Sequence, residues 1–297
     1  MSLLDSIQSL LKDPPPEFAF EISADGIAMS RTRPPATTTY AALPEGALVT
    51  SPIKENIADL PAFTAAVRKL VPASGGRRSA ALILPDNAMR LAVLEFENLP
   101  DKEQEKMALV RFRLRKTLPF DVDAAAVSYH VQSGNKVLVA VTPAEVIAQY
   151  EAPFREAGLQ PGVVIPAALA LLELLPTAGS YLVAFRNSGT LSILVVGNGI
   201  LTLARSLEPN HDATGTADGP PLDEIVTNLY ATRVYVEDQF GARPERLYLA
   251  GFGDESARVA MRLAAELDVQ IEVVKEEHPG LAGYLQSLKV VAKKVAA

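Results

Sequence analysis

The sequence predicts an α/β fold made of two similar lobes. Its 297 residues are enough for about two domains of ordinary size. Strand-like and helix-like segments alternate in both halves, which is typical of α/β proteins. Each half also has a hairpin signal near its start, Ala24-Asp25-Gly26 in the first and Gly197-Asn198-Gly199 in the second.

The composition excludes several classes of function. The 28 Lys and Arg residues against 35 Asp and Glu leave a net charge of −7, so nucleic acid is not expected as the main partner. Cys is absent, which excludes disulfides and Cys nucleophiles. His130, His211 and His278 lie too far apart in sequence for a zinc site of local ligand spacing, and we expect no metal site.

The N-terminal residues do not have the pattern of a signal peptide. Residues 1–12 lack a basic start, Asp5 interrupts their apolar run, and no segment of about 18 apolar residues follows, so we expect a cytoplasmic protein. Within residues 1–16, the proline run 14–16 ends an amphipathic helix. That helix either docks on its own domain or forms a weak peripheral anchor to a membrane or partner. Its apolar face comprises Leu3, Leu4, Ile7, Leu10 and Leu11.

The first half begins with a hairpin, a loop and a helix. Phe18–Ser23 alternates apolar and polar residues, and Ile27–Met29 resumes the strand pattern after the turn. Pro34-Pro35 and Pro44 mark a loop, and helical spacing of apolar residues then predicts a helix over 57–70. Strands are expected over 80–84 and 89–96.

The rest of the first half alternates helices and strands. Lys136–Thr142 is a nearly unbroken apolar run, typical of a strand buried on both faces. Before it, residues 102–117 are helical and end at Leu118-Pro119-Phe120. After it we expect a helix over 144–157, a strand over 163–165 and a helix over 167–175 that Pro176 stops.

The second half begins with a meander and continues with alternating helices and strands. Residues 210–221 are rich in Asp, Thr, Gly and Pro, and we expect a flexible loop there. Asp223 and Glu224 suit the start of the helix that follows. The expected strands are 182–185, 191–196, 200–204, 246–249 and 271–274, and the expected helices are 222–240, 256–267 and 281–295.

Several stretches, in this order, resemble one family. Leu43–Val49 with the helix to Leu70 looks like the opening of a small inserted subdomain, and Leu118-Pro119-Phe120 looks like its end. Lys136–Thr142 with Ala157-Gly158-Leu159-Gln160-Pro161 looks like the return to the first large subdomain. In these stretches the chain resembles the type IV pilus assembly protein PilM family, which is related to FtsA and to the cytoplasmic domain of GspL.

The resemblance implies an actin-like ATPase (RNase H-like) fold of two lobes, with a small α+β subdomain inserted in the first. Residues 17–176 would form the first lobe, with 17–42 and 136–176 as its large subdomain and 43–135 as the insertion. Residues 177–297 would form the second lobe.

The resemblance also implies a nucleotide cleft, and its motifs are altered here. Glu21 stands where the family has Asp, Ser23 where it has Gly, and Ala28 where it often has Lys. In the second hairpin Phe185 takes the Asp position and Asn187 the Gly position; Asn187-Ser188-Gly189-Thr190 is either a phosphate loop or an ordinary turn. The adenosine turn is Gly251-Phe252-Gly253, with Phe252 at a usual Gly.

These changes predict a vestigial cleft without catalytic residues. Mg²⁺ needs near-octahedral oxygen ligands, and phosphoryl transfer needs a cation near the phosphates. The residues of this cleft are Glu21, Ser23, Phe185, Asn187, Ser188, Gly189, Gly251, Phe252 and Gly253. Phe252 could still stack on an adenine, so binding of ATP and Mg²⁺ without hydrolysis stays an alternative.

A basic cluster lies at the end of the helix over 102–117. Arg111, Arg113, Arg115 and Lys116 either favour the helix C-terminus and are solvated, or contact anionic lipid or an acidic partner. In the helix over 281–295, we expect the first half to pack in the core. The sequence does not indicate a role for its last turn, which carries Lys293 and Lys294.

The function implied by the resemblance is that of a non-catalytic adaptor in a type IV pilus or type II secretion complex. It would be cytoplasmic, peripheral to the inner membrane, and would bind the N-terminal peptide of a PilN-like membrane protein between residues 43 and 165, with other assembly proteins as further partners. The alternatives are a nucleotide-binding actin-like ATPase or switch and, less favoured, a sugar-kinase-like enzyme.

Overall fold

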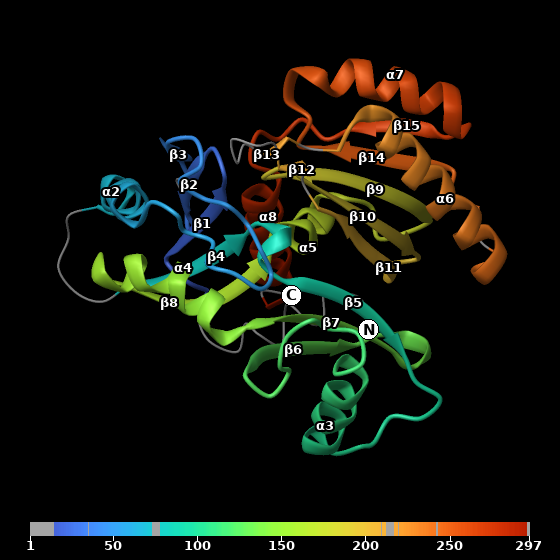
Figure 1. Ribbon diagram of the computed structural model, residues 1–297, viewed down its shortest axis with the longest axis horizontal. Coiled ribbons are helices and arrows are strands. Elements are labelled where there is room, and N and C mark those ends of the chain that lie inside the picture. The colour runs from blue at the N-terminus through green and yellow to red at the C-terminus, as the bar shows by residue number, and fades with distance from the viewer. Residues whose placement is uncertain are drawn as a thin grey trace.

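The computed structural model describes residues 15–34, 36–72, 78–208, 210–211, 217–218, 220–241 and 243–295 (Figure 1). The expected N-terminal helix lies outside these residues. Among the described residues, no helix combines the length and apolar character needed to cross a membrane.

The first lobe is built on a five-stranded sheet of order β3-β2-β1-β4-β8. The Ala24-Asp25 turn joins the first two strands, which confirms the expected hairpin, and β1, β4 and β8 run parallel. The strands are β1 (Phe18–Ser23), β2 (Gly26–Arg31), β3 (Thr39–Ala42), β4 (Arg78–Leu84) and β8 (Leu159–Pro166). The helices are α2 (Leu60–Leu70), α4 (Ala144–Glu156) and the short α5 (Ala167–Leu171), which η3 (Leu172–Leu174) continues.

The two faces of this sheet differ in side-chain size. Phe18, Phe20 and Ile22 of β1 pack with α2 and α4 in one core. Ala19, between them, faces the opposite core, which contains α5 and the last helix of the chain. Because side chains alternate between the faces of a strand, small residues on one side let a helix approach the sheet closely.

The insertion carries its own three-stranded sheet of order β5-β7-β6. Its elements are β5 (Arg90–Glu95), α3 (Glu103–Leu114), β6 (Ala125–Val131) and β7 (Lys136–Pro143), with short 3₁₀ turns η1 (Asp86–Ala88) before it and η2 (Ser133–Asn135) within it. Alternate β7 residues, Val137, Val139 and Val141, pack under Val110 and Leu114 of α3.

The expected boundaries of the insertion, 43 and 135, are therefore wrong. Strand β4 belongs to the large sheet, whereas β7 is the central strand of the small one. The prediction that β7 is buried on both faces is confirmed, since Leu138 packs into the core on the opposite side from α3. Burial on both faces does not distinguish the centre of a small antiparallel sheet from a strand of a parallel one.

The second lobe has a five-stranded sheet of order β11-β10-β9-β14-β15. Its strands are β9 (Ser180–Asn187), β10 (Thr190–Gly197), β11 (Ile200–Leu207), β14 (Arg246–Ala250) and β15 (Gln270–Val273), with helices α6 (Leu222–Phe240) and α7 (Ser256–Leu267) and the turn η4 (Gly253–Glu255). Within the segment expected as a flexible loop, β12 (Asn210–His211) and β13 (Ala217–Asp218) form a short antiparallel pair.

The last helix, α8 (Pro279–Val295), packs on the first lobe, although the sequence boundaries assign it to the second. Leu281 and Tyr284 lie in the core formed with α5 and the small residues of β1 and β4. A Cβ on Gly283 would lie 2.0 Å from the carbonyl oxygen of Ala170, so the backbones of α5 and α8 approach closely only because Gly283 has no side chain.

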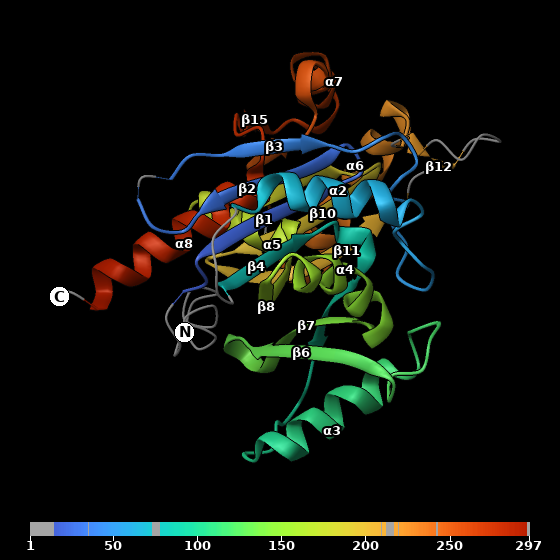
Figure 2. The same cartoon turned by 90° about the vertical axis from the view of Figure 1, so that its left-hand side faces the viewer.

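The insertion also touches the second lobe. Gln132, next to β6, donates to the carbonyl of Leu201 and accepts from its N–H, both at 2.9 Å, and Arg90 of β5 pairs with Glu208. Figure 2 shows β5 to β7 below the large sheet, with α3 beneath them. The two lobes and the insertion thus form one connected body.

Candidate functional site

A cleft of about 580 Å³ lies where the two hairpin turns and the start of α8 meet. It brings together seven of the nine residues predicted from the sequence: Glu21, Ser23, Phe185, Asn187, Ser188, Gly189 and Gly251. Phe252 and Gly253 do not line it. The other lining residues, which the sequence did not indicate, include Tyr40, Arg186, Glu255, Glu277 and His278.

Glu21 of the first hairpin is hydrogen-bonded to the start of α8. Its carboxylate accepts a hydrogen bond of 2.7 Å from the backbone N–H of Leu281, in the first turn of that helix, and only 5% of the residue is exposed. Burial raises the pKa of Glu21 to about 7, against the opposing effect of backbone hydrogen bonds from Leu281 and Gly280. A carboxylate at a helix start satisfies free N–H groups there, so Glu21 serves as a cap for α8.

The hairpin of β9 and β10, which is distinct from the hairpin of β10 and β11 at Asn198-Gly199, touches the first hairpin directly. Its turn residues Ser188 and Gly189 have positive φ angles of 51° and 76°, as a tight hairpin turn requires. The Ser188 hydroxyl accepts a hydrogen bond of 2.9 Å from the N–H of Ala24 and donates one of 2.8 Å to Asn187 Oδ1. The N–H at the tip of the first hairpin is therefore already satisfied by the second.

The side chains of Phe185 and Phe252 both lie in hydrophobic cores. Phe185 is fully buried in the core that joins the lobes. Phe252 is buried in the core of the second lobe, with the Arg186 guanidinium 4.8 Å from its ring centre. The expectation that Phe252 could stack on an adenine is wrong, because its ring points into the lobe and away from the cleft.

Gly251 is required by packing within the protein. Its φ is +77°, and a Cβ there would lie 2.0 Å from the carbonyl oxygen of Arg186. The turn after β14 thus lies directly against β9. A glycine that the sequence suggests for nucleotide contact is explained by the approach of two backbone segments.

The cleft is negatively charged. Glu21, Asp25, Glu255 and Glu277 line it, whereas Arg186 is the one Lys or Arg among the described lining residues. Arg186 pairs with Glu255 at 2.7 Å, and this hydrogen bond holds the Glu255 pKa below its usual value. Among the described residues, no three His, Cys, Asp or Glu side chains are grouped to hold a metal ion.

One wall of the cleft mouth is aromatic. The rings of Tyr40 and His278 stack with centres 5.5 Å apart, and burial lowers the His278 pKa. The Tyr40 hydroxyl donates to the carbonyl of Asp25 at 2.7 Å, which fixes the first hairpin turn against β3. No local signal in the sequence indicates the stacking contact, because Tyr40 and His278 are far apart in the chain.

Asp86 is a second buried carboxylate, and it is absent from the residues predicted from the sequence. It accepts hydrogen bonds from the N–H of Ala168 in α5 at 2.8 Å and from the hydroxyl of Ser192 in β10 at 2.7 Å. Burial raises its pKa to about 6. It joins the end of β4 to the second lobe, and a polar residue directly after the apolar run and Pro85 is the signal that could have identified it.

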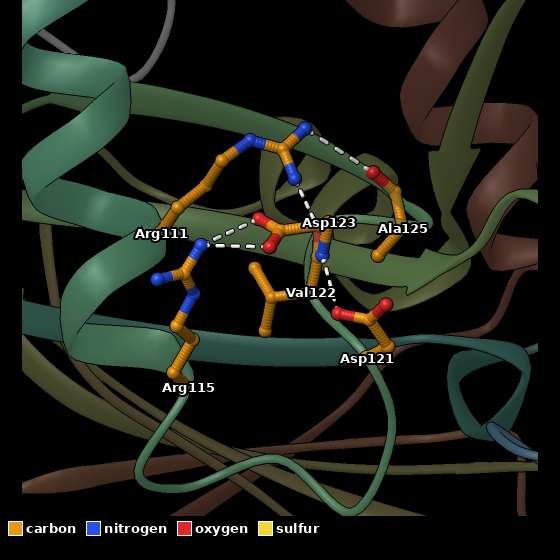
Figure 3. A network of polar contacts seen from close by, with 6 residues as sticks. All are labelled: Arg111, Arg115, Asp121, Val122, Asp123 and Ala125. Carbon is orange, nitrogen blue, oxygen red and sulfur yellow. Dashed lines mark hydrogen bonds and ion pairs between the residues drawn. The ribbon is translucent and has the colours of Figure 1, made fainter.

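Two arginines of the basic cluster at the end of α3, Arg111 and Arg115, make internal contacts (Figure 3). Arg111 donates to the carbonyls of Val122 and Ala125, the latter at 3.2 Å, and Arg115 makes two hydrogen bonds to Asp123 at 2.8 and 2.7 Å. The hydrogen bonds from Arg115 lower the pKa of Asp123. These two arginines therefore fasten the helix to the segment before β6.

The fold is that of actin-like ATPases, which confirms the predicted class. A solved Bacteroides thetaiotaomicron protein of unknown function with an actin-like ATPase fold superposes with a TM-score of 0.56 at 13% identity, covering 90% of this chain and 94% of that one. No protein-family model matches the chain, and no curated protein sequence matches it significantly.

The chain is also similar in structure to a PilM-PilN type IV pilus biogenesis complex, with a TM-score of 0.71 and 18% identity over 96% of this chain and all of that one. A third similar structure is the cytoplasmic domain of EpsL, an inner-membrane component of the Vibrio cholerae type II secretion system. It has a TM-score of 0.53 and 11% identity over 93% of this chain and 94% of that one.

Proposed function

We propose that this protein is a non-catalytic actin-like scaffold of an inner-membrane assembly complex, of the type IV pilus or type II secretion kind. It would lie on the cytoplasmic side, peripheral to the membrane, and bind the N-terminal peptide of a PilN-like membrane protein. The likeness to the PilM-PilN complex and to the EpsL cytoplasmic domain supports this proposal. The peptide would bind between the large sheet of the first lobe and the insertion.

The observation that carries the non-catalytic part is the contact between the two hairpins. A nucleotide cleft of this fold needs turn N–H groups for phosphate and a carboxylate near the metal. Here the N–H of Ala24 donates to Ser188, and Glu21 accepts from the start of α8. A triphosphate would have to replace both contacts and would meet the carboxylates of Asp25 and Glu277 without a free arginine or lysine among the described lining residues.

The alternative is a nucleotide-binding switch of the same machinery. The volume of the cleft, about 580 Å³, favours it, because small-molecule sites commonly enclose about 300–1,000 Å³. A titration with a fluorescent ATP analogue, with and without Mg²⁺, separates the two. We expect no saturable binding at micromolar concentrations; such binding, competed by unlabelled ATP, would establish the alternative.

Peptide capture tests the adaptor function. The probe is a synthetic peptide with the cytoplasmic N-terminal sequence of the PilN-like protein from the same genome, and its control is the same residues in scrambled order. We expect saturable binding of the first and none of the second by isothermal titration calorimetry. Equal binding of both, or of neither, would refute the proposal.

A further inference from the structure

Strand β6 has an open edge. It is the terminal strand of the insertion's sheet, paired with β7 on one side only within the described part of the chain. In an antiparallel pair, residues whose backbone groups bond to the partner strand alternate with residues whose backbone groups point away from it. The N–H of Gln132 donates to the carbonyl of Lys136, and the N–H of Ala144 donates to the carbonyl of Ala124. The backbone groups of the even-numbered residues of β6 therefore point toward β7.

The outward groups are consequently those of the odd-numbered residues. The first outward carbonyl, that of Ala125, accepts from Arg111. The N–H and carbonyl groups of Val127, Tyr129 and Val131 follow, and no described strand pairs with them. This gives a stretch of five residues, 127–131, with alternate backbone groups directed away from the sheet.

This edge lacks the features that protect the other sheet edges. Strand β8 carries Pro161 and Pro166 and a register shift, and β3 and β15 have four residues each. Strands β5 and β11 face each other across the contact between insertion and second lobe. Strand β6 has seven residues in continuous register, with no proline and no Asp, Glu, Lys or Arg. Unprotected edges of this kind are templates for another strand.

Hydrogen bonds join helix α3 to strand β6 at two positions, and they fix the strand relative to the helix. Glu103 accepts a hydrogen bond of 2.5 Å from the hydroxyl of Tyr129, and Arg111 binds the strand's first residue. In Figure 2, β6 runs across the front of the insertion, with β7 just above it and α3 below. The open edge is the side of β6 that faces away from β7.

We infer that β6 binds an extended segment of the partner protein by strand addition over residues 127–131. This inference rests on the proposed function and names the backbone that would hold the peptide. Main-chain hydrogen bonds would supply affinity, and alternate side chains of the added strand would supply specificity.

The charges around the edge indicate an uncharged segment. The strand itself has no charged residue, and the ionic groups at its two ends are already paired, Arg115 with Asp123 and Lys136 with Glu95. A charged side chain opposite Val127 or Val131 would lose water without gaining a partner. The segment that binds is therefore uncharged at the positions opposite Val127 and Val131, with β-branched or aromatic side chains there.

The test uses one outward N–H. Val127→Pro removes an N–H that points away from β7, and proline is tolerated at such edge positions. Val127→Ala is the matched control, because it loses similar packing and keeps the N–H. With the PilN-like peptide as probe, we expect Val127→Pro to weaken binding at least tenfold and Val127→Ala to stay within about threefold, provided that both variants melt as cooperatively as the parent chain.

Peptides methylated at single backbone nitrogens give a second readout that does not depend on folding of a variant. Strand addition requires loss of binding at every second position of the peptide. Capture of the peptide with no such alternation, or with equal affinity for both Val127 variants, would overturn strand addition while leaving the adaptor function intact. Absence of any capture by the parent chain would refute the adaptor function and this inference together.

Discussion

The inter-lobe cleft and the β6 edge differ in whether their backbone groups have hydrogen-bond partners. In the cleft, the N–H groups at the first hairpin tip and at the start of α8 are satisfied by Ser188 and Glu21. At the edge, the groups of Val127, Tyr129 and Val131 have no strand partner among the described residues. Unmade backbone hydrogen bonds are what a ligand or partner can use. We therefore expect binding at the edge of the insertion rather than in the cleft.

The largest effect on stability is expected at Gly251, where the turn after β14 packs against β9. Gly251→Ala places a Cβ 2.0 Å from the Arg186 carbonyl oxygen at a φ of +77°, so the turn must move. We expect a loss of about 3 kcal/mol or more in the free energy of unfolding, from overpacking and backbone strain together. Urea denaturation measures it. Gly162→Ala is the control, because no atom lies within 4 Å of its added Cβ; equal stability of the two variants would contradict the packing role of Gly251.

The next effect is a pH dependence from Glu21. Its pKa is about 7 in the folded chain against an ordinary glutamate value of 4.5, so between these values the folded state holds a proton that the unfolded chain has lost. Stability contributed by this group is therefore present below about pH 4.5 and is lost as the pH rises through 7. A shift of this size corresponds to about 3 kcal/mol.

Glu21→Gln checks this assignment. The amide oxygen can still accept from the N–H of Leu281 but does not ionise, so we expect its stability to vary less between pH 5 and pH 8 than that of the parent chain. Denaturation midpoints at both pH values measure the difference. Parallel pH profiles of the two proteins would show that Glu21 is not the titrating group, with Asp86 the next buried carboxyl to replace by Asn.

A smaller effect is expected at the contact between the hairpins. Ser188→Ala removes the acceptor for the N–H of Ala24, and a hydrogen bond of this kind contributes about 1 kcal/mol. Hydrogen exchange at the Ala24 amide should become faster. If the contact is what excludes phosphate, this variant should also bind the ATP analogue more tightly than the parent chain; unchanged exchange at Ala24 would argue that the two turns do not meet.

The smallest effect is expected on the surface of α3. Arg115→Ala breaks an exposed ion pair with Asp123, and such pairs contribute little to stability. We expect an unchanged melting temperature and unchanged peptide affinity. Arg111→Ala should differ, because Arg111 holds the carbonyl of Ala125 at the start of the open edge. If Arg111→Ala and Arg115→Ala bound the peptide with equal affinity, the hydrogen bond from Arg111 to Ala125 would have no role in peptide binding.

The local features of the fold could be predicted from sequence. Asp25-Gly26 and Asn198-Gly199 identify hairpins because few residues tolerate the turn geometry, and the strands and helices follow from apolar spacing. Of the nine cleft residues that the resemblance indicated, seven line one cleft, namely Glu21, Ser23, Phe185, Asn187, Ser188, Gly189 and Gly251. What each of them contacts could not be predicted.

The sequence by itself determined the class of fold and the hairpin turns at Asp25-Gly26 and Asn198-Gly199, since these depend on residue type and local spacing. Only the tertiary structure decided that β7 lies in the insertion, that α8 returns to the first lobe, that Phe252 faces the core and that Glu21 caps α8. Periodicity reports that a face is buried. Which element covers that face depends on close packing between segments distant in the chain, as at Gly283 against Ala170.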